Sequence, residues 1–205
     1  MKKFALLLIG ICLASCSDKK TTLETENDAV STDTIKYVPP KVTDNAYEII
    51  PGERIGLTKL DENTETLSEL GKPDFSDSAM GKSWTTWISK DGEKNELNIY
   101  STYKDSEMKE KVVRQIRITS PKFQTPSEIS TGKSLQEIQK VYPDIKLVAK
   151  YTDEKTKNLV ELYDSETNGI AFEFTQNKCS AIIVHTNGKK VTEEYITLHP
   201  NMEKF

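Results

Sequence analysis

Short runs in which apolar positions alternate imperfectly with polar ones recur along the chain from residue 83 onward. Each run holds five to seven residues and is rich in Val, Ile, Leu, Tyr, Trp and Thr. Such runs are typical of half-buried β-strands. The pattern predicts six strands, at residues 83–88, 96–100, 112–118, 159–163, 169–174 and 180–184. Asp91-Gly92 and Asn168-Gly169 mark turns within the two groups of three.

A short helical stretch precedes each group of three strands. The first covers residues 63–70, where Leu67 and Leu70 share a face and Gly71 and Pro73 end the helix. The second begins at Ser134, and Glu137 follows at the spacing of a capping box. Its apolar stripe consists of Leu135, Ile138, Val141 and Tyr142.

The repeated order of elements predicts an α+β fold made of two tandem units. Each unit is a short helix followed by a three-stranded antiparallel meander, because a helix this short needs a sheet to pack on. The expected boundaries are 46–124 for the first repeat and 125–205 for the second repeat with its C-terminal tail. The tail, from residue 191, is expected to form a last edge strand or a strap across the sheet.

The N-terminus has the features of an export signal. Lys2 and Lys3 precede an apolar stretch at residues 4–13, and Leu13-Ala14-Ser15-Cys16 follows. This segment resembles the lipobox signal of bacterial lipoproteins, which implies that residues 1–15 are a signal peptide and that Cys16 carries the lipid anchor. The alternative is an ordinary secretory signal with an incidental cysteine.

The same resemblance predicts a location in the envelope of a Gram-negative bacterium. Ser17, rather than Asp, follows Cys16, and by resemblance this favours delivery to the outer membrane. Residues 16–45 are dominated by Thr, Ser, Asp, Glu and Lys, so they are expected to form a flexible tether behind the lipidated cysteine. Whether the body faces the periplasm or the cell surface is left open.

Charge and cysteine content narrow the function classes. The chain has 28 basic and 32 acidic residues, for a formal net charge of −4, which argues against a general nucleic-acid binder. Cys12 would leave with the signal peptide and Cys16 would be lipidated, so Cys179 alone would remain. We therefore expect no disulfide within the mature chain.

No set of residues predicts catalysis, a cofactor or a metal. Gly132-Lys133-Ser134 lacks the earlier glycine of a phosphate loop, since Ser127 stands there. In one unbroken strand, Cys179 and His185 would share a face but lie about 20 Å apart, too far to share a metal. The other histidine is His199, and no Gly-x-Ser-x-Gly elbow is present. We expect the chain not to be an enzyme.

Three aromatic residues are the candidate contacts for a ligand or partner. Trp84 and Trp87 are three residues apart and so point to opposite faces of a strand, and Tyr100 lies on the next strand. One tryptophan should be in the core, and an exposed one could contact a sugar or a protein. The alternative is that the other tryptophan is covered by the second unit and packs between the domains.

The body also resembles small binding folds of the bacterial envelope. Gly71-Lys72-Pro73-Asp74, directly after a short helix, is similar to the helix-plus-meander repeats of β-lactamase-inhibitor-protein and SmpA-type outer-membrane lipoproteins. The resemblance implies a protein-binding module tethered to the outer membrane, with an envelope protein as partner. The alternative is a lipoprotein that binds a glycan or small molecule in a cleft between the repeats.

Overall fold

The computed structural model divides the chain into two units, Met1–Pro40 and Lys41–Phe205. It describes residues 44–193, 199 and 201–205, all within the second unit. Cys16, the signal peptide and nearly all of the predicted tether lie outside the described residues. None of the helices that the structure describes is long and apolar enough to cross a membrane.

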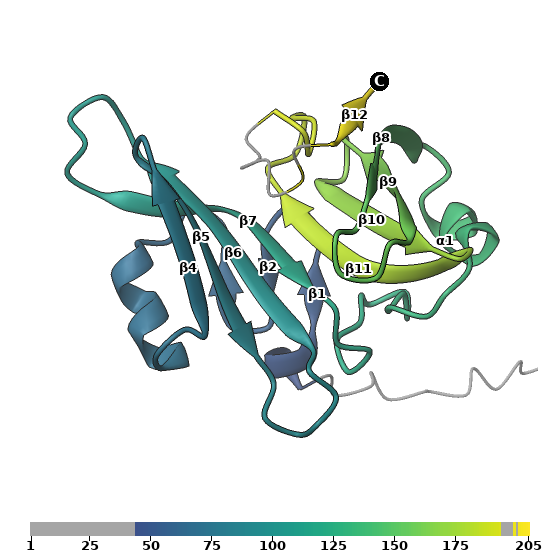
Figure 1. Cartoon of the computed structure of the whole chain (residues 1–205), viewed down its shortest axis with the longest axis horizontal. Helices are drawn as coiled ribbons and strands as arrows, with labels where there is room; N and C mark the ends of the chain where they lie inside the picture. Colours follow the sequence, from purple (N-terminus) through teal and green to yellow (C-terminus); the bar gives the residue numbers. More distant parts are fainter. Residues whose placement is uncertain (1–43, 194–198, 200) are drawn as a thin grey trace, which may run out of the picture. The chain divides into compact units, whose positions relative to one another are not determined.

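A nine-stranded antiparallel sheet forms most of the described body, in the order β12-β8-β9-β10-β11-β7-β6-β5-β4. Figure 1 shows β4 to β7 and β8 to β11 as two groups that meet where β7 lies beside β11. The strands are β4 (Phe75–Ala79), β5 (Lys82–Ile88), β6 (Glu96–Tyr103), β7 (Lys111–Ile118), β8 (Lys146–Thr152), β9 (Leu159–Ser165), β10 (Ile170–Thr175), β11 (Lys178–His185) and β12 (Glu203–Lys204).

The predicted pair of helix-plus-meander units is wrong. The two meanders do not close as separate units, because β11 pairs with β7 from Ile182↔Ile118 to His185↔Gln115. Each meander also gains a strand that the sequence analysis did not predict, β4 on one side and β8 on the other. The described body is therefore mainly β, with only short helical segments.

One face of the large sheet carries the main apolar core. A second sheet of three short strands, β1 (Ile49–Ile50), β2 (Arg54–Ile55) and β3 (Thr58–Lys59), contributes to this core. So do the 3-10 helix η2 (Thr64–Leu70) and the helix α1 (Leu135–Val141), whereas the 3-10 helix η1 (Asn45–Tyr47) buries no residue. Fully buried members on the sheet include Ile99, Ile116, Phe172 and Ile182.

The capping box at the start of α1 is confirmed. The Glu137 amide donates to the Ser134 hydroxyl at 3.3 Å, and the Ser134 amide donates to the Glu137 carboxylate at 2.8 Å. The amide and hydroxyl of Ser134 stabilise the carboxylate and lower the pKa of Glu137 from 4.5 to about 2. Ile138, fully buried one residue later, ties this helix start to the core.

The lowered pKa of Glu137 predicts a pH-dependent contribution to stability. Because the folded pKa lies below the unfolded one, the stabilisation is present above pH 4.5 and is lost as pH falls toward about 2. We expect Glu137→Gln to be less stable than wild type at neutral pH and to differ little from it near pH 2. Urea unfolding of both proteins across this range measures the effect, and a constant difference at every pH would contradict it.

Candidate functional site

The second face of the nine-stranded sheet holds two of the three predicted contact residues. Trp84 on β5 and Tyr100 on β6 are direct neighbours across the two strands, and they form a cluster with Met202. Only 3% of Trp84 and 1% of Tyr100 is exposed. Their rings are therefore not surface platforms in this structure, and their role as contacts for a ligand or partner stays a prediction.

Trp87 lies on the opposite face and belongs to the edge of the main core. It packs against the core cluster and its indole Nε1 donates to the Gly71 carbonyl at 3.1 Å. The indole therefore fixes the end of η2 against β5. The structure places Trp87 away from Trp84 and Tyr100, so the three predicted contacts do not form one site.

A buried ion pair joins strands near the middle of the second face. Arg117 on β7 donates to both carboxylate oxygens of Glu173 on β10, at 2.7 to 3.2 Å, and Glu173 is 1% exposed. The same guanidinium donates to the side-chain oxygen of Asn98 at 2.7 Å. Asn98 in turn donates to the Thr86 hydroxyl at 2.9 Å. This series of hydrogen bonds runs from β10 to β5. It engages the side chains of Glu173, Arg117 and Asn98 in contacts within the sheet.

Two buried polar side chains, those of Asp164 and Gln115, hold the start of the C-terminal segment. His185 Nε2 lies 2.9 Å from one oxygen of Asp164, and the other oxygen accepts the Val191 amide at 2.8 Å. The side-chain Nε2 of Gln115 donates to the Val191 carbonyl at 2.6 Å, and Val191 is fully buried. The Gln115 side-chain oxygen is buried without a partner among the described residues. A hollow lined by Arg114, Gln115, His185, Thr186, Lys189 and Lys190 opens beside it.

Cys179 and His185 point to different faces, contrary to the expectation for one unbroken strand. A bulge between Glu173 and Phe174 shifts the β10–β11 register, so that Cys179 faces Phe174 in the main core. Burial raises the pKa of the Cys179 thiol, which keeps it protonated. This environment does not suit a reactive nucleophile.

His199 is stacked on Tyr151, with ring centroids 3.7 Å apart and the planes 13° from parallel. Burial lowers the pKa of His199, which favours the neutral ring in this stack. Among residues 44–193 and the described part of the tail, no group of three His, Cys, Asp or Glu is arranged to hold a metal ion. The segment 194–198, where an edge strand was expected, lies outside the described residues.

The strand β4 lies on the surface along its whole length. All five of its residues are exposed, and Phe75 presents 54% of its surface. In the described part of the chain, β4 pairs with β5 alone, so its other edge has no neighbouring strand. Figure 1 shows β4 as the outermost strand of its group. An edge strand with free backbone N–H and C=O groups is a template for pairing with another chain.

The turn from β4 to β5 identifies which backbone groups face outward. Met80 and Gly81 form this two-residue turn with φ of 52° and 81°, as a type I′ hairpin requires. Such a turn closes on a hydrogen-bonded pair, here Ala79 and Lys82, and bonded pairs then alternate along the ladder. Ser76 and Ser78 therefore direct their backbone groups to the open edge. The Met80 side chain at the tip is 98% exposed.

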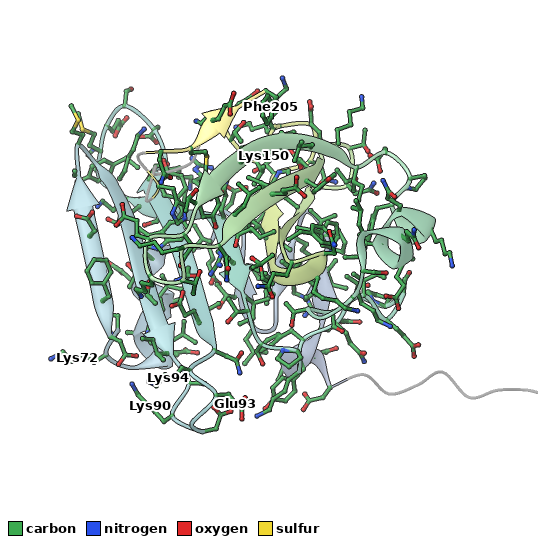
Figure 2. All side chains as sticks on the ribbon, turned by 45° about the vertical axis from the view of Figure 1, so that its right-hand side comes forward. Lys72, Lys90, Glu93, Lys94, Lys150 and Phe205 are labelled. Atoms are coloured by element: carbon green, nitrogen blue, oxygen red, sulfur yellow. The ribbon has the colours of Figure 1, made fainter. Side chains whose placement is uncertain are left out.

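At the other end of the large sheet, the C-terminus covers part of the outer edge of β8. There the two residues of β12 add to β8, with Glu203 opposite Lys150, and the Phe205 amide donates to the Val148 carbonyl at 2.8 Å. Figure 2 shows Phe205 beside Lys150 at this end, whereas Lys72, Lys90 and Lys94 lie near the start of β4. The C-terminus thus covers part of one sheet edge, whereas no described segment pairs with the outer edge of β4.

No strand was expected at β4, because Phe75-Ser76-Asp77-Ser78-Ala79 lacks a β-branched or apolar run. Met80-Gly81 immediately before the predicted strand at 83–88 is the signal that could have revealed it. Glycine at the second position of a two-residue loop is typical of a hairpin, and a hairpin needs a preceding strand.

Removing one partner of the buried ion pair should be costly. We expect Glu173→Ala to lower the free energy of unfolding by about 3 kcal/mol, because a part-buried guanidinium loses its two-pronged carboxylate partner. Replacing both partners, in Arg117→Met/Glu173→Met, should cost less than the single change. Denaturant unfolding measures both proteins, and a double variant that is the less stable of the two would contradict this account.

No family model, curated protein or solved structure matches this chain.

Proposed function

We propose that this chain is a non-enzymatic protein-binding module, tethered by lipidated Cys16 to the outer membrane of a Gram-negative envelope. The open edge of β4 is the binding surface of this proposal. The N-terminal signal supports the tether, and the exposure of all five β4 residues supports the binding surface. In this proposal, the partner is an envelope protein.

The observation that carries the proposal is the difference between the two edges of the sheet. An open edge risks aggregation, and natural proteins protect such edges with prolines, lysines, bulges or covering segments. The residues of β4 contain no proline and no lysine, and its pairing with β5 has no register shift. Asp77 is the one charged residue of β4, and a five-residue edge without proline, lysine or bulge suits pairing with a partner strand.

Four of the exposed large apolar side chains lie on β4 or on segments next to it. Phe75 begins β4, Met80 follows its end at 98% exposure, and Leu70 closes η2 at 38%. Met108, 63% exposed, belongs to the loop between β6 and β7, which leaves the sheet at the same strand ends as the β4–β5 turn. Apolar side chains flanking an open edge would add buried area to the main-chain pairing.

The alternative of a glycan or small molecule bound between the repeats has weaker support. It relied on Trp84 or Trp87 stacking on the ligand, but Trp84 is buried and Trp87 is used to hold Gly71. The two predicted repeats are moreover parts of one sheet. These contacts give the ligand no exposed aromatic face at the expected place.

Photocrosslinking in intact cells tests the proposed function. A photoreactive amino acid replaces Ser76 on β4, and in a matched control it replaces Glu154, which is exposed in the β8–β9 turn near the other edge of the sheet. We expect a discrete adduct, identified by mass spectrometry as an envelope protein, from position 76 and none from position 154. The same adducts from both positions, or none from position 76, would contradict the proposal.

The anchor is tested in the same cells with Cys16→Ser. We expect this variant to leave the membrane fraction and to lose the adduct at position 76, since an unlipidated chain no longer stays beside its partner. Membrane retention of Cys16→Ser at the wild-type level would contradict lipidation at this residue.

A further inference from the structure

The centre of the β4 edge carries one charge, and its position bears on what can pair there. Asp77 is the middle residue of β4, between Ser76 and Ser78, and its side chain is exposed. It makes no ion pair within the described part of the chain; the nearby Lys82 lies opposite Ala79, not opposite Asp77. The carboxylate is therefore available to a residue on an added strand.

The register places Asp77 where an added strand would come closest. Ser76 and Ser78 supply the outward backbone bonds, so Asp77 occupies the non-hydrogen-bonded position between them on the open edge. Opposing side chains approach most closely at such positions, with Cα atoms about 4.5 Å apart. Opposite charges there favour pairing, and like charges directly opposite disfavour it.

This position argues against a second copy of the chain as the occupant. Antiparallel pairing of β4 with itself over its full length is centred on Asp77 and sets that carboxylate against its own copy. Registers centred on Ser76 or Ser78 avoid this clash, but they pair fewer of the five residues. The charge thus disfavours self-association while leaving the edge open to a different strand.

We infer that the partner contributes an extended segment that adds antiparallel to β4 and places a lysine or arginine opposite Asp77. This inference rests on the proposed function and names the chemistry of its partner. Phe75 and Ala79 share the Asp77 face, so the partner residues two positions to either side of the basic one are apolar. Residues facing Ser76 and Ser78 are small and polar.

Two synthetic peptides test this chemistry directly. The first is a blocked, fluorescently labelled Thr-Val-Thr-Lys-Thr-Val-Thr, and the second has Glu in place of Lys. Binding is measured by fluorescence anisotropy on the full chain, purified from cells in detergent. We expect the lysine peptide to bind about fivefold more tightly than the glutamate peptide, because an attractive cross-strand pair replaces a repulsive one. Equal binding of the two peptides, or no binding of either, would overturn the inference.

Variants of β4 separate charge from backbone pairing. Asp77→Lys should reverse the order of the two peptides. Ser78→Pro removes an outward N–H and should weaken both peptides at least tenfold, whereas Ser78→Thr keeps that N–H and should bind like wild type. Proline is tolerated on an edge strand where its missing N–H faces outward, so we expect Ser78→Pro to melt close to wild type. If that variant does not fold, the reversal by Asp77→Lys decides the question.

Two further results would overturn the inference. Unchanged peptide order in Asp77→Lys overturns the inference, and so does a dimer of the wild type that Ser78→Pro abolishes. The peptide measurement uses purified protein, so its failure leaves the crosslinking test of the proposed function untouched. A crosslinked partner found without charge reversal would retain the binding surface and refute the basic residue.

Discussion

The pairing of β11 with β7 determines the rest of this body. It joins two groups of strands into one sheet, and it brings residues 115–118 beside residues 182–185. On one face this pairing unites Ile116, Ile182 and Phe172 in a single core, which α1, η2 and the small sheet help to form. On the other face it brings Arg117 within reach of Glu173 and Gln115 within reach of Val191. Without it, neither polar group on the second face would be complete.

A continuous open sheet must end somewhere, and its two ends differ. At β8 the chain returns to add β12, and the hydrogen bonds of Val191 fix the beginning of that return to Asp164 and Gln115. At β4 no described segment returns, and the strand is held by β5 and by the contacts of its flanking residues, such as Asp74 with Ile88 and Lys90.

Local signals in the sequence were sufficient for the central strands and for the α1 capping box, because both depend on neighbours a few residues apart. The merging of the meanders was not predictable in this way, since it depends on Ile118 meeting Ile182 across most of the second half of the chain. The bulge beside Phe174, which turns Cys179 into the core, likewise has no local signature. The exposure of Trp84 was not predictable for another reason. Both faces of the sheet carry apolar clusters, so period-two alternation does not say which face is exposed to solvent. The strand that carries the proposed binding surface, β4, is polar and was missed.

The central claim is that the β4 edge is open and that Ser76 and Ser78 present its free backbone groups. Residue-resolved amide hydrogen exchange by NMR tests this on the full chain in detergent, without any partner. The account predicts alternation, with rapid exchange at Ser76 and Ser78 and slower exchange at Asp77 and Ala79, whose amides bond to β5. Uniform protection along residues 75–79 would show that another segment already covers this edge, and it would contradict the account.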